Sequence, residues 1–250
     1  MKLKIGTYNV CHCGDYENRK ETDPKFVTAI NMENTARTIK NLGLDIIGLN
    51  EVYDEGKIPE RVQQTEKVAA LAGYEYCVFA KGETYSWVTI GNAVMSHYPI
   101  INVEKITVAK PPVEERIPKE AWWEDRVLLI VDIDVKGQII RIIESHFGLN
   151  PPELKNILKE TCKIIDNSPY PVVLMGDLNV LSDNPELNCI YERLTSVAKE
   201  TGNKEFTFAS YDPQCQIDYI FVPKTAKVIS STVHKVMTSD HRPLTAEIEL

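Results

Sequence analysis

The apolar residues of this chain form many short runs that have the character of β-strands. The clearest run is Val172 to Met175, which continues directly into Gly176. An unbroken run of β-branched and aliphatic residues is typical of a strand that is covered on both faces. The same pattern predicts strands at residues 3–10, 44–51, 74–80, 88–96, 100–109, 126–135, 138–145, 206–208, 216–222, 227–235 and 244–250.

Helical spacing of the apolar residues occurs in only four places. Residues 26–42 show it and are followed by Gly43, a typical C-terminal stop. Residues 60–72 are amphipathic, and residues 151–166 begin with proline, which suits the first turn of a helix. Residues 185–199 are predicted to be mainly helical. Many strands and few helices indicate an α/β protein.

The length of 250 residues suits one large layered domain, because no Ser/Gly linker, repeat or low-complexity run divides the chain. We therefore predict a single domain over residues 1–250. A stretch of about 18 apolar residues, as a membrane span requires, is absent from the sequence, and so is an apolar signal region. We expect a cytoplasmic protein, and a monomer.

Acidic residues outnumber basic ones by 36 to 28, so the formal net charge is −8. A negative chain repels a polyanion at long range unless a local basic patch compensates, and no Lys/Arg cluster stands out. Composition therefore argues against strong non-specific binding of DNA. A divalent cation bound in a site would reverse the local sign of the charge.

The six cysteines do not predict a disulfide framework, because they are scattered over a chain large enough to build a core. Cys11, His12 and Cys13 follow one another and offer donors for a soft metal. A structural zinc needs four ligands, and no second Cys/His pair follows at finger spacing. We therefore do not expect a zinc finger.

Polar residues recur where the predicted strands end. Alternation in a strand points Asp177 and Asn179 to the same side, which makes an oxygen-rich site suited to a hard cation or to the activation of water. Taken singly, such residues are equally typical of turns, exposed loops or a core histidine that is satisfied by a carbonyl. The full set comprises Asn9, Glu51, His146, Asp177 with Asn179, and Asp240 with His241. Asp218 lies inside an apolar strand and is predicted to pair with a histidine or an arginine.

Residues 110–123 form a long loop with three prolines that ends in Trp122 and Trp123. Long loops in compact domains are often binding loops. The two tryptophans either stack on a base or an apolar part of a substrate, or anchor the loop to the core. We expect this loop and residues 11–24 to choose the substrate.

Six short motifs, in this order along residues 3–250, resemble the endonuclease/exonuclease/phosphatase superfamily of DNase-like, metal-dependent phosphoesterases. They are Thr7-Tyr8-Asn9-Val10, Leu49-Asn50-Glu51-Val52, Ser145-His146-Phe147, Gly176-Asp177-Leu178-Asn179, Ile217-Asp218-Tyr219-Ile220 and Ser239-Asp240-His241-Arg242-Pro243. The resemblance implies a four-layered α/β sandwich, in which two mainly antiparallel sheets pack face to face with helices outside. Asn50 departs from the pattern, where glutamine is usual, and Ser145 and Phe147 replace the commoner threonine and leucine.

The resemblance also implies a set of ligands for a divalent cation, which is Mg²⁺ or alternatively Mn²⁺. Glu51 would be the main ligand, with Asn9 and Asp240 beside it, directly or through water. Mg²⁺ prefers oxygen ligands and keeps several waters, so few protein ligands are enough.

The catalytic roles implied by the resemblance fall on five further residues. Asp177 would deprotonate the attacking water, and Asn179 and His146 would hold non-bridging oxygens of the phosphate. His241, oriented by Asp218, would stabilise the charge that develops at phosphorus. Substrate contacts are expected from Asn92, Arg126, Trp122 and Trp123. In the abasic-site endonuclease branch a tyrosine is common at the place of His146, so this chain resembles the DNase, lipid phosphodiesterase and phosphatase branches more.

We therefore predict a divalent-metal-dependent phosphoesterase that hydrolyses a phosphodiester or a phosphomonoester by direct attack of water. The substrate is a small-molecule or lipid phosphate, or alternatively DNA or RNA. The alternative hypothesis outside the enzyme class is a catalytically inactive relative that binds a phosphorylated partner.

Overall fold

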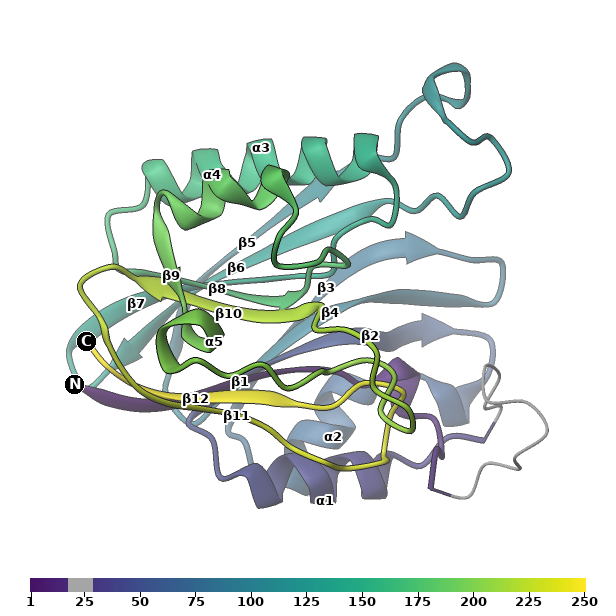
Figure 1. Ribbon diagram of the computed structural model, residues 1–250. Coiled ribbons are helices and arrows are strands. Elements are labelled where there is room, and N and C mark those ends of the chain that lie inside the picture. The colour runs from purple at the N-terminus through teal and green to yellow at the C-terminus, as the bar shows by residue number, and fades with distance from the viewer. Residues whose placement is uncertain (18–28) are drawn as a thin grey trace.

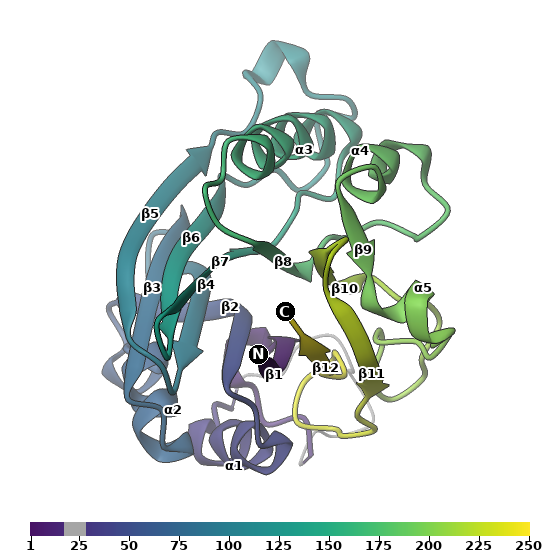
Figure 2. The ribbon, with the colours of Figure 1, turned by 90° about the vertical axis from the view of Figure 1, so that its left-hand side faces the viewer.

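The structure is a computed structural model, and it describes residues 1–17 and 29–250. Two six-stranded sheets pack face to face, with helices on the outer face of each (Figures 1 and 2). The first sheet has the order β11 (Lys227–Val233), β12 (Leu244–Glu249), β1 (Lys2–Asn9), β2 (Ile46–Gly56), β4 (Val88–Ser96), β3 (Tyr76–Thr84). The second has the order β5 (Ile100–Val108), β6 (Arg126–Val135), β7 (Gln138–Ser145), β8 (Val172–Asp177), β10 (Asp218–Pro223), β9 (Leu194–Ser196).

Two pairs in the middle of the sheets are parallel, β1 with β2 and β7 with β8, and the other pairs are antiparallel. A parallel pair needs a long crossover, usually a helix. The crossovers contain α1 (Met32–Leu42) and α3 (Pro151–Asp166). Each helix therefore returns the chain so that the carboxyl ends of both strands meet at one edge of the sheet.

Three apolar layers separate four layers of secondary structure, which confirms the predicted four-layered α/β sandwich. The central layer lies between the sheets and includes Ile5, Leu129 and Val173. A second layer lies under α1 and α2 (Gln64–Ala72), and a third lies under α3 and α4 (Asn188–Tyr191). Strands such as β8 are buried on both faces because apolar layers cover both sides of each sheet.

Most strands expected from the sequence are present, and β4, β6, β7 and α3 have the predicted bounds. The predicted helical segment 185–199 is wrong in part, because β9 interrupts it before α5 (Val197–Thr201). The predicted strand 206–208 is wrong, since Phe208 makes only isolated bridges, to Cys215 and His241. The start of the helix predicted at 26–42 and much of the loop 11–24 lie outside the described residues. Within the described ranges, no helix is both long enough and apolar enough to cross a membrane.

Candidate active site

The carboxyl ends of the two parallel pairs bring polar residues together from both sheets. Asn9 ends β1 and pairs with Asn50 of β2, while Asp177 ends β8 and His146 follows β7. Asp218 begins β10 and pairs with Asp177 across the antiparallel ladder. The packing of one sheet on the other therefore brings together residues as distant in the sequence as Asn9 and Asp218.

Glu51 is placed by an irregularity in β2. The pairing of β2 with β4 shifts register between Leu49 and Val52, and Glu51 has a φ of 57°. Such a bulge changes the direction in which a side chain points, and a left-handed conformation is uncommon for glutamate. The backbone therefore turns the Glu51 carboxylate towards Asn9 instead of continuing the strict alternation of the strand.

Asn9 joins two carboxylates of the site. Its Nδ2 atom donates to Oε1 of Glu51 at 2.9 Å and to Oδ2 of Asp177 at 3.1 Å. Its Oδ1 atom accepts from the main-chain N–H of Cys11 at 3.0 Å, which fixes the orientation of the amide. Asn9 thus offers hydrogens, not its oxygen, to the interior of the site.

Asp177 lies at the centre of the cluster and is almost fully buried. Its Oδ1 accepts from the main-chain N–H of Asn179 at 2.9 Å. Its Oδ2 lies 3.5 Å from Nε2 of His241 and 3.6 Å from Nε2 of His146. Burial raises the pKa of Asp177 to about 7, although the nearby charge of His241 and the hydrogen bonds lower it.

His241 and Asp218 form a buried pair. Nδ1 of His241 lies 2.9 Å from Oδ2 of Asp218, so the N–H of the ring donates to the carboxylate. Burial alone would lower the pKa of His241, but the charges of Asp218 and Asp177 outweigh it and hold the pKa well above its ordinary value. The predicted pairing of Asp218 with a histidine is present, and the ring is a cation at neutral pH.

His146 is held in the opposite charge state. Its Nε2 lies 2.8 Å from Nδ2 of Asn179, and the same amide donates to the main-chain oxygen of Phe147 at 3.0 Å. Because the amide nitrogen only donates, Nε2 of His146 accepts and the ring is neutral. Burial, with the charges of Arg126 and His241, keeps the pKa of His146 well below its usual value.

Glu51 and Asp240 are the acidic groups that suit a cation at this site. Burial and then the charge of Asp240 raise the pKa of Glu51, so the negative charge of Asp240 disfavours ionisation of Glu51. Oxygen donors on neighbouring carboxylates are what Mg²⁺ prefers, and a cation would remove this repulsion. The residues present therefore fit a hard divalent cation.

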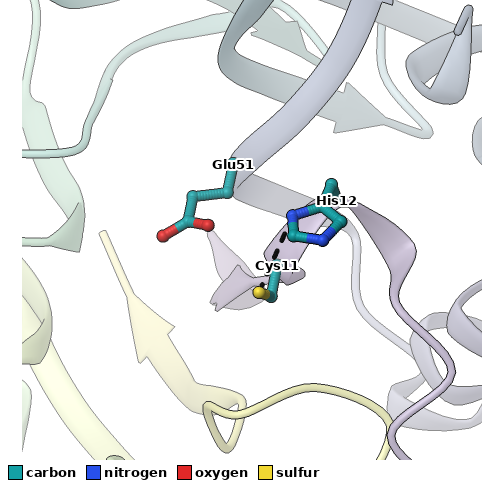
Figure 3. Close-up of side chains that lie close together, drawn as sticks. All are labelled: Cys11, His12 and Glu51. Atoms are coloured by element: carbon teal, nitrogen blue, oxygen red, sulfur yellow. Dashed lines mark hydrogen bonds between the residues drawn. The ribbon is translucent and has the colours of Figure 1, made fainter. Parts of the chain in front are cut away.

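Among the residues that the structure describes, two groups of three side chains have metal-ligating atoms within 4.8 Å of one another. One consists of Asp177, Asp218 and His241, and the other of Cys11, His12 and Glu51. In the first group Nδ1 of His241 is already engaged with Asp218. The second group brings a thiol and an imidazole next to Glu51 (Figure 3).

Arg126 is buried beside the cluster. Its Nη2 lies 2.8 Å from Oε2 of Glu124, and Oε1 of the same carboxylate accepts a hydrogen bond from the hydroxyl of Tyr85. Its Nε has no hydrogen-bond partner among the described residues. The positive charge of Arg126 contributes to the lowered pKa of His146. A buried guanidinium with an unused N–H is suited to an anionic oxygen.

The other expected substrate contacts lie farther out or are fully engaged. Trp122 is 60% exposed, and its ring centroid is 6.0 Å from that of Tyr85, so its side chain does not anchor the loop in the core. Nε1 of Trp123 donates to the main-chain oxygen of Pro118 within the same loop. Asn92 is buried, with Oδ1 accepting from Asn50 and Nδ2 donating to Val127.

Two residues that support the site were missed in the sequence. Asn50 accepts from the main-chain N–H of Asp177 at 2.8 Å and donates to Oε1 of Glu144 at 2.7 Å. Asn50 thus contacts the main chain of Asp177, and no local sequence pattern predicts this contact. Glu144 is fully buried, and the signal that identified Asp218, an acidic residue within an apolar strand, is present there too.

A pocket of about 820 Å³ opens beside Asn179, between the loop that follows β7 and the loop that follows β8. Leu149 and Leu181 line it and are 58% and 52% exposed. Lys155 and Asp183 also line the pocket and carry opposite charges. The pocket therefore offers a largely apolar surface next to the polar cluster.

The fold and the polar edge together define a DNase-like α/β sandwich. The model of the endonuclease/exonuclease/phosphatase family matches residues 6–241, and the chain belongs to this family. Its members are hydrolases that act on phosphate esters and generally use a divalent metal.

Relatives are similar over most of the chain. Uncharacterized protein YbhP of Escherichia coli (strain K12) is 27% identical over 232 residues, which are 85% of this chain and 86% of YbhP. The endonuclease/exonuclease/phosphatase from Beutenbergia cavernae DSM 12333 has a TM-score of 0.77 and 23% identity, covering 100% of this chain and 72% of its own. Mannosyl-6-phosphatase Bt3783 of Bacteroides thetaiotaomicron VPI-5482 has a TM-score of 0.74 and 13% identity, covering 99% and 100%. These structural likenesses establish the fold.

Proposed function

We propose that this protein is a divalent-metal-dependent phosphoesterase in which Asp177 is the general base for direct attack of water on phosphorus. The observation that carries the proposal is the pair of hydrogen bonds from Nδ2 of Asn9, to Glu51 at 2.9 Å and to Asp177 at 3.1 Å. These bonds connect Glu51, a proposed ligand of the cation, to Asp177, the proposed base. A family member that only binds phosphate has no need of a buried base with a pKa of about 7.

Asp177 removes a proton from water at neutral pH, because its raised pKa matches that task. His241 stays protonated through Asp218 and donates from Nε2 to an oxygen of the phosphate, where negative charge increases in the transition state. Asp218 is the positioning residue of this pair, since it fixes the ring and its charge.

Glu51 and Asp240 are the proposed protein ligands, and Asn9 acts indirectly because its oxygen is engaged with Cys11. A divalent cation held there, Mg²⁺ or Mn²⁺, supplies neutralisation of charge on the phosphate and on the leaving oxygen. Asn9 also keeps Glu51 and Asp177 at a fixed separation before the substrate enters.

Asn179, His146 and Arg126 are the proposed contacts of the non-bridging oxygens. An entering phosphate competes for the Nδ2 hydrogens of Asn179 and so frees Nε2 of His146, which takes up a proton from solvent as the phosphate anion binds and donates it in a hydrogen bond to the phosphate. The unused Nε of Arg126 supplies a further charge-assisted donor.

The substrate we propose is a small-molecule or lipid phosphate ester, not a nucleic acid. The net charge of −8 and the exposed apolar side chains of Leu149 and Leu181, in the pocket beside Asn179, support this class. The name of one structural neighbour, mannosyl-6-phosphatase, is that of an enzyme for a small phosphomonoester. Asn92, which reaches the site through Asn50, and Trp123 are proposed to support the substrate only indirectly.

The test is a panel of phosphate esters with Mg²⁺ or Mn²⁺, containing aryl mono- and diesters, sugar phosphates, phospholipid headgroup esters and DNA. We expect hydrolysis of a small ester that EDTA abolishes and that Glu51→Gln and Asp177→Asn reduce by at least about 100-fold. Glu55→Gln, on the exposed end of the same strand, is the matched control and should keep full activity. Absence of hydrolysis of every ester, or equal activity of Asp177→Asn, contradicts the proposal.

Salt separates the two substrate classes. A nuclease that contacts several phosphates loses affinity steeply as salt rises. We expect KM for the preferred ester to change less than about threefold between 50 and 200 mM salt, in the range where a nuclease loses orders of magnitude. A steep slope with DNA as the preferred substrate would move the assignment to a nuclease.

A further inference from the structure

Three side chains with different metal-ligating groups lie close together beside the polar cluster, namely Cys11, His12 and Glu51 (Figure 3). Cys11 and His12 belong to η1 (Cys11–Cys13), the 3-10 turn that follows β1, and Glu51 belongs to the bulge of β2. Sγ of Cys11, a ring nitrogen of His12 and a carboxylate oxygen of Glu51 all lie within 4.8 Å of one another. Neither the base nor the proposed phosphate contacts use Cys11 or His12.

The separation of sulfur and nitrogen is that of a tetrahedral site. Sγ of Cys11 lies 3.7 Å from Nδ1 of His12. Zinc binds thiolate at about 2.3 Å and imidazole at about 2.0–2.1 Å, so in a tetrahedron the two donor atoms are roughly 3.6 Å apart. A cation can therefore contact both atoms with almost no movement of the turn.

The ligands are also held in place by their neighbours. The ring of His12 stacks on Tyr53 with the centroids 4.8 Å apart and an angle of 8°. The main-chain oxygen of His12 accepts from Nε2 of Gln64 at 2.8 Å, and Oε1 of Gln64 accepts from the N–H of Tyr53. The hydroxyl of Tyr16 lies 3.1 Å from Sγ of Cys11 and can donate to a thiolate. Such supporting contacts orient ligands before a metal arrives.

Cys13 does not belong to this group, although it is the next cysteine in the sequence. It is buried in the apolar layer under α1 and α2. The third ligand is instead Glu51, which is 39 or more positions away in the chain and is brought in by the parallel pairing of β1 with β2. A site of this kind is invisible to a search for paired Cys/His motifs.

We propose that Cys11, His12 and Glu51 form a three-ligand site for a borderline-soft divalent cation of the Zn²⁺ class. Thiolate and imidazole donors select such ions and are poor ligands for Mg²⁺. Binding replaces the proton on the thiol, which leaves to solvent, and involves no change of oxidation state. Three protein ligands leave a fourth position open, as in sites that bind water or an exchangeable group.

Because Glu51 is also the main proposed ligand of the catalytic cation, the two ions compete for one carboxylate. Zn²⁺ should therefore inhibit a reaction supported by Mg²⁺. This consequence rests on the proposed function, whereas binding of the soft ion does not.

The direct test uses Co²⁺ as a spectroscopic substitute for Zn²⁺ and needs no substrate. Titration of the purified, metal-free chain should produce a thiolate-to-cobalt charge-transfer band that saturates at one ion per chain and is removed by added Zn²⁺. Cys11→Ser and His12→Asn should weaken Co²⁺ and Zn²⁺ binding by more than about tenfold, and Cys11→Ser should abolish the band. Cys77→Ser, on β3, is the matched control and should leave the band unchanged.

Two results would overturn the proposal. One is the absence of a thiolate band in the unaltered protein, and the other is an identical band in Cys11→Ser. Circular dichroism of each variant shows whether it is folded, and His12→Asn, which keeps a polar side chain of similar size, provides a second test if Cys11→Ser fails to fold. Protection from thermal unfolding by Zn²⁺ should follow the same order of variants.

A separate arm measures inhibition of the Mg²⁺-supported reaction. Zn²⁺ should inhibit the unaltered protein and Cys77→Ser at the concentration that saturates the cobalt site, and should inhibit Cys11→Ser only at concentrations more than about tenfold higher. Equal inhibition of all three overturns the sharing of Glu51. If no ester is hydrolysed at all, the proposed function fails while the cobalt spectrum still tests the site.

Discussion

Nε2 of His146 accepts a hydrogen bond from Nδ2 of Asn179 at 2.8 Å, so the neutral ring carries its proton on Nδ1. The alternative orientation of the amide would bring its oxygen to the main-chain oxygen of Phe147, which now accepts from the nitrogen at 3.0 Å. The hydrogen-bond network therefore defines both the amide orientation and the tautomer. The site contains one neutral histidine and one charged histidine on either side of Asp177.

This arrangement predicts the tautomer of His146 in the free protein. We expect ¹⁵N-edited NMR to find Nδ1 protonated and Nε2 unprotonated at and above about pH 6, because burial and nearby cations lower the pKa of His146. The internal control is His97, which is exposed and lies in the turn after β4. A ring proton on Nε2 of His146 contradicts the predicted network.

The rate of hydrolysis should rise with pH through the titration of Asp177. The pKa of Asp177 is raised to about 7, and only the ionised form accepts a proton from water. A bound cation favours the ionised form, so with saturating metal we expect kcat/KM to rise with a midpoint between about 5 and 7, to level off, and to fall again at higher pH, where His241 loses its proton. A profile that is flat between about pH 5 and 8 is incompatible with Asp177 as the base.

Asp218→Asn should lower kcat and move the descending limb of the same profile to lower pH. The negative charge of Asp218 raises the pKa of His241, so the ring loses its proton at lower pH when this charge is removed. We expect a loss of about 100-fold or more in kcat with a small change in KM. Asp212→Asn, at an exposed position, is the control. A loss of activity without a shift of the descending limb would assign Asp218 a merely structural role.

Asp177→Asn should stabilise the metal-free protein above neutral pH while it removes activity. The ordinary pKa of an aspartate is about 3.9, whereas that of Asp177 in the folded chain is about 7, so folding binds a proton between these values. The stability of the unaltered protein therefore falls as pH rises from about 4 to 7. We expect Asp177→Asn to gain about 1–2 kcal/mol at pH 7.5 in urea unfolding with EDTA, and less at pH 5. An equal effect at both pH values would show that ionisation of Asp177 is not the cause.

Much of the fold follows from sequence because its apolar pattern is simple. The unbroken run in β6 and the proline at the start of α3 are local signals, and both elements have the predicted bounds, whereas β8 extends past the predicted end at Met175 to Asp177. The helical segment predicted at 185–199 is wrong in part because β9 is three residues long. This strand is defined by its pairing with β10, which a local sequence pattern does not indicate.

The candidate site was found in outline because its residues stand at strand ends, where the chain changes from apolar to polar. Its geometry was not predictable. Glu51 depends on a bulge and a φ of 57°, and the amide of Asn9 depends on the N–H of Cys11. The grouping of Cys11 and His12 with Glu51 likewise results from strand pairing, which joins residues that are distant in sequence.

The contact between Gly48 and Glu144 gives the last prediction. A Cβ atom on Gly48 would lie 1.7 Å from Oε2 of Glu144, so the two strands approach this closely only because residue 48 has no side chain. Glu144 is fully buried, its pKa is raised well above the ordinary value, and its Oε2 has no hydrogen-bond partner within the described part of the chain. The side chain is therefore a neutral acid that supports Asn50, and through Asn50 the N–H of Asp177.

Gly48→Ala should destabilise the protein by about 1–3 kcal/mol, because the added methyl group must displace a side chain in a packed interior. Glu144→Gln should cost less than about 1 kcal/mol at neutral pH, since an amide replaces an uncharged acid of nearly the same shape and Oε1 still accepts from Asn50. Combining Gly48→Ala with Glu144→Ala should recover part of the loss, because truncation makes room for the methyl group. Urea unfolding of the unaltered protein, Gly48→Ala, Glu144→Ala and the double variant measures this coupling, and strictly additive effects would mean that the clash with Glu144 is not what requires glycine at position 48.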